Sequence, residues 1–92
     1  MTTAFTIRRA DLADLAALDR LAALDSSSAP TGDVLVAEVG GELWAALELG
    51  SGRAIADPFR HSGSLVELLR VHARGIGRPE RRPLRALLPR AA

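Results

Sequence analysis

The sequence predicts an α+β fold in which helices pack on a sheet with antiparallel central strands, in the order β-α-β-β-β-α. Residues 34–60, VLVAEVGGELWAALELGSGRAIADPFR, contain three apolar stretches separated by glycine-rich turns, as expected for consecutive antiparallel strands. A strand pattern and a leucine-rich helix pattern precede this segment, and a second helix pattern follows it. Helices and strands in this order bury their apolar faces by packing as layers.

The length and composition are those of one small globular domain. Its 92 residues allow only a modest core, and 48% hydrophobic with 25% charged residues is ordinary for a soluble protein. The absence of cysteine excludes a disulfide framework, a thiolate zinc site and a cysteine nucleophile. Neither a signal-peptide pattern nor roughly 18 consecutive apolar residues occur, so we expect a cytoplasmic protein without a membrane anchor.

The first strand and the first helix are predicted from the first 24 residues. Residues 4–9 alternate apolar and polar side chains, which is the period of a half-buried strand. Asp11 is predicted to cap a helix over 12–24, with Asp14 adding negative charge near its positive end. Leucines recur every third residue and predict a broad apolar surface that packs on a sheet: Leu12, Leu15, Leu18, Leu21 and Leu24.

Three further strands are predicted over 34–39, 42–49 and 53–57. Residues 34–39 are apolar on both faces, as in a strand covered on both sides, and Gly40 with Gly41 predicts a two-residue hairpin turn. Strict alternation along 42–49 predicts that Leu43 and Ala45 share one face and that Trp44 lies on the other. Trp44 could there anchor a partner or pack beneath a neighbouring element. Asp57 before Pro58 is predicted to end the last strand in a turn.

A second helix is predicted over 64–74, followed by a basic tail. Its predicted inward stripe comprises Leu65, Leu68, Leu69, His72 and Ile76. We expect one domain over 1–78 and a weakly ordered Pro/Arg-rich tail over 79–92. Residues 1–73 hold six arginines against ten acidic residues, whereas 74–92 hold six arginines against one glutamate. The tail lacks aromatic residues for base stacking, so solubility or docking on an acidic surface is favoured over nucleic-acid binding.

Two stretches of the sequence, TIRRADLADLAAL and VLVAEVGGELWAAL, resemble the N-terminal half of the GNAT family of acetyl-CoA-dependent N-acetyltransferases. The resemblance covers residues 5 to about 74. The family holds the coenzyme A pyrophosphate on a loop with the pattern Q/R-x-x-G-x-G/A, at the start of a helix. The corresponding stretch here is Arg60, His61, Ser62, Gly63 and Ser64, in which Arg60 and Gly63 fit the pattern, and the resemblance implies that these residues would bind acetyl-CoA. Leu65 stands where the family has a small residue, and a leucine there is expected to crowd the phosphate.

The chain also departs from the family in its missing second half. In the family, further strands complete the cofactor cleft and a tyrosine commonly serves as general acid, but this sequence contains no tyrosine. We therefore expect a truncated, degenerate GNAT-like module that binds a protein partner or forms a homodimer through an exposed sheet edge. The alternative is an acetyl-CoA-dependent N-acetyltransferase whose site is completed by a second chain.

No catalytic residue and no metal site is identified from the sequence. Glu42 or Glu48 could act as a base toward an amine, although solvated glutamates are the favoured interpretation on an alternating strand. His61 is interpreted as an ordinary loop histidine, and His72 as a hydrogen-bonded histidine at the edge of the core.

Overall fold

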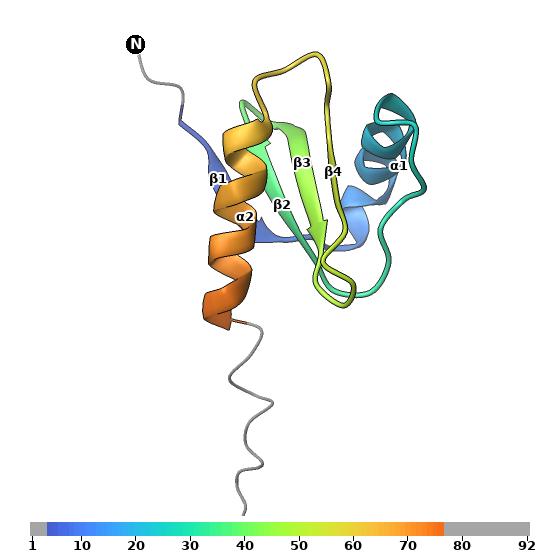
Figure 1. Cartoon of the computed structure of the whole chain (residues 1–92). Helices are drawn as coiled ribbons and strands as arrows, with labels where there is room; N and C mark the ends of the chain where they lie inside the picture. The colour runs from blue at the N-terminus through green and yellow to red at the C-terminus, as the bar shows by residue number, and fades with distance from the viewer. Residues whose placement is uncertain (1–3, 77–92) are drawn as a thin grey trace, which may run out of the picture.

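Four strands form one antiparallel sheet, and their order in space follows their order in the chain (Figure 1). The computed structural model describes residues 4–76, and the predicted tail over 79–92 lies outside them. The α+β class and the predicted order of elements are confirmed. The elements are β1 (Thr6–Arg9), the 3-10 helix η1 (Leu12–Asp14), α1 (Leu15–Leu24), β2 (Val34–Val39), β3 (Glu42–Glu48), β4 (Ala54–Ala56) and α2 (Gly63–Ile76).

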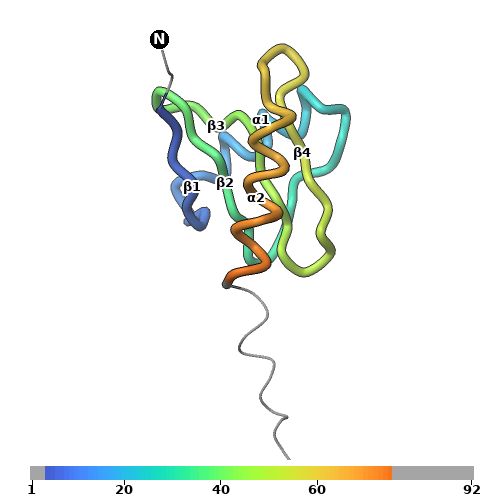
Figure 2. Tube along the Cα trace, turned by 60° about the vertical axis from the view of Figure 1, so that its left-hand side comes forward, coloured from blue at the N-terminus to red at the C-terminus, as the bar shows by residue number. Residues whose placement is uncertain are grey.

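The two helices cover opposite faces of the sheet, so the molecule has two apolar clusters (Figures 1 and 2). The predicted double-sided pattern of β2 is confirmed, because alternate residues of this strand enter different clusters. On the α1 face the buried members are Leu18, Leu21, Ala22, Val34, Val36, Leu43, Ala46 and Ile55. On the α2 face they are Leu35, Ala37, Val39, Ala45, Leu47, Leu65 and Leu69.

The predicted helix over 12–24 begins as a 3-10 turn, and α1 starts only at Leu15. Asp11 caps this turn as predicted, because its carboxylate accepts a hydrogen bond from the Ala13 amide at 2.9 Å. The Asp14 carboxylate in turn accepts from the Asp11 amide at 2.8 Å, which completes a capping box. The apolar surface is narrower than predicted, since Leu12 and Leu15 are exposed.

The prediction that Leu43 and Ala45 share a face of the third strand is wrong, because β3 contains a bulge. Ala37 of β2 pairs with Ala45, but the next residue, Glu38, pairs with Leu43. Trp44 is therefore an extra residue on β3, and the side-chain alternation shifts at this point. Leu43 lies in the α1 cluster, whereas Trp44 and Ala45 both lie on the α2 face.

The turns agree with the predictions, but the inward face of α2 does not. Gly40 and Gly41 have φ of 59° and 86°, the positive angles that a two-residue hairpin turn requires. The buried stripe of α2 runs through Leu65 and Leu69 and is flanked by Val66 and Ala73. Leu68 is 39% exposed and His72 is exposed, so their predicted places in the core are wrong. Within residues 4–76, neither helix is long and apolar enough to cross a membrane.

Candidate functional site: the α2 start and the adjoining groove

The predicted cofactor loop lies between β4 and α2, where side chains of the loop hold it in place. Asp57 ends the strand in a turn, as predicted, and its carboxylate accepts from the Phe59 amide at 2.8 Å. The Ser62 hydroxyl donates to the Asp57 carbonyl at 3.0 Å, and the Ser62 amide donates to the Arg60 carbonyl at 2.9 Å. Because Ser62 is buried and both of its donors are used, its role here is to fix the loop.

The side chain of Arg60 binds groups of its own chain. Its Nη2 donates to Glu42 Oε1 at 2.9 Å, and its Nε lies 3.7 Å from Asp57 Oδ2. The guanidinium carbon also lies 5.1 Å from the centroid of the Trp44 ring, within cation–π range. Trp44 Nε1 donates to the same Glu42 oxygen at 3.3 Å. In this conformation Arg60 connects the loop to β3, and the carboxylates of Glu42 and Asp57 compensate its positive charge.

The first turn of α2 is more open than the loop before it. Among residues 4–76, no acceptor receives a hydrogen bond from the amides of Gly63, Ser64 and Leu65. A Cβ at Gly63 would meet no atom within 4 Å, so this position faces open space. The Leu65 side chain is 6% exposed and belongs to the core beneath the helix. Free amides at a helix start favour anions, and this feature of the predicted cofactor site is present.

An apolar groove of about 350 Å³ adjoins this turn, between α2 and Phe5, the residue that directly precedes β1. We call it the β1–α2 groove; its lining residues are Phe5, Val39, Trp44, His61, Ser64, Leu65 and Leu68. Phe5 is 46% exposed and Leu68 is 39% exposed, and Val71, one turn along α2 from Leu68, is 54% exposed. In Figure 2, α2 lies over the sheet between β2 and β4, with β1 beside it. Two residues of the predicted cofactor site line the groove: His61, in the loop before α2, and Ser64, in the first turn of the helix.

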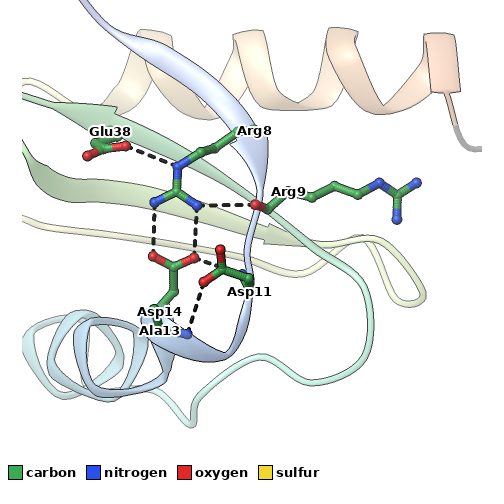
Figure 3. A network of polar contacts seen from close by, with 6 residues as sticks. All are labelled: Arg8, Arg9, Asp11, Ala13, Asp14 and Glu38. Atoms are coloured by element: carbon green, nitrogen blue, oxygen red, sulfur yellow. Dashed lines mark hydrogen bonds and ion pairs between the residues drawn. The ribbon is translucent and has the colours of Figure 1, made fainter.

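A charged cluster on the other face of the sheet joins β1 to the start of the first helix (Figure 3). Arg8 donates to both oxygens of Asp14, at 2.8 and 2.9 Å, and its Nε donates to Glu38 Oε1 at 3.0 Å. The hydrogen bonds from Arg8, assisted by the Asp11 amide, outweigh burial and lower the pKa of Asp14 to about 2. Such a carboxylate is a weak base at neutral pH, so we interpret the cluster as a structural clamp.

The two glutamates considered as bases are both engaged in structural contacts. Glu48 accepts from the Thr31 amide at 2.7 Å and from the hydroxyl groups of Thr31 and Ser51. These hydrogen bonds lower its pKa to about 2, the Ser51 hydroxyl having the largest effect. Glu48 therefore joins the loop before β2 to the turn after β3, and Glu42 is bound by Arg60 and Trp44. The interpretation as a solvated glutamate holds for Glu42, whose side chain is 50% exposed, and is wrong for Glu48, whose side chain is 13% exposed.

The start of α2 was predictable from the sequence, whereas the groove was not. One sequence feature could have indicated an exposed Phe5, since this residue begins an alternating strand pattern. No feature indicates that Leu68 is exposed, because helical spacing places it next to buried leucines. In comparisons with known proteins, no family model, no curated protein and no solved structure matches this chain.

Proposed function

We propose that this chain is a GNAT-like binding module that forms a homodimer through the β1 side of its sheet and does not act as a stand-alone catalyst. The observation that carries the proposal is the β1–α2 groove, in which Phe5 and Leu68 are exposed, together with the exposed Val71 one turn along α2 from Leu68. Apolar side chains gathered around one hollow are typical of interaction sites, whereas single exposed ones are ordinary.

The sheet topology supports the GNAT-like part of the proposal. Four antiparallel strands in chain order, with a helix on each face, are the arrangement that the sequence resemblance implies for the N-terminal half of that family. The internal use of Arg60 supports the non-catalytic part, since this residue of the family's loop pattern binds Glu42 of its own chain, and Ser62 in the same stretch holds the loop in place. Fold alone does not assign chemistry, so the proposal depends on the groove.

The first prediction is that the wild-type chain is a dimer whose formation depends on the groove. Light scattering after size exclusion should give twice the chain mass, and the double variant Phe5→Ser/Leu68→Ser should give the monomer mass with an unchanged circular dichroism spectrum. Leu15→Ser is the matched control, because Leu15 is an exposed leucine on the opposite face of the sheet. A wild-type chain that stays monomeric at all concentrations would rule out the proposal.

A second candidate function is the acetyl-CoA-dependent N-acetyltransferase whose cleft is completed by a second chain. The open amides of Gly63, Ser64 and Leu65 favour it, because an anionic pyrophosphate could accept from them. His61 and Ser64 would then face the ligand from the groove.

The second prediction separates the two functions by calorimetric titration with acetyl-CoA. The binding-module proposal predicts no saturable heat at micromolar ligand. Micromolar binding that weakens at least tenfold in Gly63→Leu would instead establish the acyltransferase candidate. Gly50→Leu serves as the control, since Gly50 is also an exposed glycine with no atom within 4 Å of an added Cβ and lies in the β3–β4 turn.

A further inference from the structure

We propose that the two copies join edge to edge through β1, in an antiparallel register that places Ile7 opposite Ile7 of the partner subunit. This inference rests on the proposed homodimer and specifies its geometry. The pairing would extend two four-stranded sheets into one continuous sheet around a two-fold axis. Each β1–α2 groove then lies beside the junction.

The outer edge of β1 presents unpaired backbone groups. The Ala10 amide donates to the Val34 carbonyl at 2.8 Å. This hydrogen bond shows that the backbone groups of Ala10 point toward β2. Because the direction of backbone groups alternates along an antiparallel strand, Ala10 and Arg8 face β2 whereas Ile7 and Arg9 face outward. Within residues 4–76, the one hydrogen bond on this outer edge is donated by Arg8 Nη1 to the Arg9 carbonyl, at 3.2 Å. The outward groups of Ile7 are therefore available to a second strand.

The opposite edge of the sheet is protected by comparison. β4 has three residues, and the same alternation places the backbone groups of Ala54 and Ala56 on its outer side. The Ala56 amide is already bound there, since it donates to Asp25 Oδ2 at 3.2 Å. A short strand whose outward amide is bound by a carboxylate is a poor template for pairing. The comparison selects β1 as the edge that joins.

Charge and strand length select the register. Centring the pair on Arg8 or on Arg9 would place two arginines directly opposite each other, which destabilises a sheet. Centring it on Thr6 would pair only one residue of β1 with β1 of the partner subunit. Centring it on Ile7 pairs Thr6, Ile7 and Arg8 with residues of the partner's β1, sets Phe5 opposite Arg9 and opposes no like charges. This register also makes Ile7 a hydrogen-bonded pair with its own copy.

The side chains on the α2 face suit this register. Phe5, Ile7 and Arg9 lie on that face, where Ile7 packs against the α2 cluster and Phe5 lines the groove. Phe5 would lie across from the partner's Arg9, whose aliphatic stem can cover the exposed ring while the guanidinium stays hydrated. The existing ion pair between Arg9 and Asp33 is 3.5 Å long and exposed on both sides, so it holds Arg9 weakly.

The third prediction uses cysteine cross-linking, which the cysteine-free chain permits without background. The register places the two copies of residue 7 at the Cα separation of about 5.5 Å that suits a disulfide. We expect Ile7→Cys to cross-link at least tenfold faster than Arg9→Cys under mild oxidation, although residue 9 is more exposed. An equimolar mixture of Phe5→Cys and Arg9→Cys should form the heterologous disulfide.

The outcomes separate this inference from the proposed function. A dimer by light scattering in which Ile7→Cys cross-links no faster than Arg9→Cys would overturn the β1 register and leave the homodimer standing. A monomeric wild type would overturn both. Rapid cross-linking of Ala54→Cys, on the outer side of β4, in place of Ile7→Cys would assign the junction to the other edge.

Discussion

Leu69→Ala is expected to lower the free energy of unfolding by about 2–5 kcal/mol, the usual range for removing a buried leucine side chain. Leu69 is 0% exposed and packs with Leu35, Leu47 and Leu65 between α2 and the sheet. The substitution removes apolar contacts and leaves a cavity that a helix anchored by few large side chains cannot close. Small domains have total stabilities near about 5 kcal/mol, so most of the stability would be lost. Urea unfolding followed by circular dichroism measures the change.

Leu68→Ala is the matched control, because it removes the same atoms from the neighbouring residue of the same helix. Leu68 is 39% exposed on the rim of the groove, so its truncation should lower stability in the monomer by only about 1 kcal/mol. Both measurements belong in the Phe5→Ser background, where dimerisation is weakened. If the two alanine variants lost equal stability, the placement of α2 on the sheet would be wrong, and the broader stripe predicted from the sequence would be right.

The difference between these two leucines shows where sequence reasoning succeeded and where it stopped. Strand positions and the Gly40–Gly41 hairpin were predictable because local patterns and backbone conformation determine them. The face of α2 that packs on the sheet was not predictable, since leucines lie on both sides of its apolar stripe and the pattern does not determine the centre of that stripe. The bulge at Trp44 was equally hidden: both faces of β3 carry apolar residues, so a shift in alternation leaves no trace in the pattern.

The candidate site likewise has features that were predictable from the sequence and features that were not. The position of Arg60–Ser64 between a strand and a helix followed from the order of elements. The partners of Arg60 did not, because Glu42 lies 18 residues away and meets it only through the sheet. The Asp11 cap was predictable, being a contact between near neighbours, whereas the binding of Arg8 to Asp14 and Glu38 required the packing of β1 against both β2 and η1.

Asp14→Asn is expected to destabilise the chain by about 2 kcal/mol, the range for hydrogen bonds made by a charged group. The amide that replaces the carboxylate can accept through only one oxygen, so Arg8 loses half of its two-bond contact and its opposing charge. The capping contact to the Asp11 amide is weakened as well. Glu67→Gln, at an exposed position of α2, is the control and should change stability by less than about 0.5 kcal/mol.

The pH dependence of this variant tests the charge on Asp14 directly. The folded-state pKa of Asp14 is about 2, below its ordinary value of 3.8, so between these values the unfolded chain binds more protons than the folded chain. The stabilisation is therefore complete above about pH 4 and is lost as the pH falls toward 2. Urea titrations from pH 6 to pH 2 should show that the difference in free energy of unfolding between wild type and Asp14→Asn shrinks as the pH falls from about 4 to 2. Glu48 titrates in the same window in both proteins and cancels from the difference.

If the difference in free energy of unfolding between wild type and Asp14→Asn stayed constant down to pH 2, the clamp would be contradicted, because protonation of Asp14 would then not alter its contact with Arg8.

If the difference shrinks as expected, the clamp also bears on the proposed dimer. Arg8 lies in β1, and the clamp holds this strand against η1 while its outer edge remains open. Loosening the clamp should disorder the edge on which pairing depends, so Asp14→Asn should also weaken dimerisation at pH 7, as measured by light scattering on dilution.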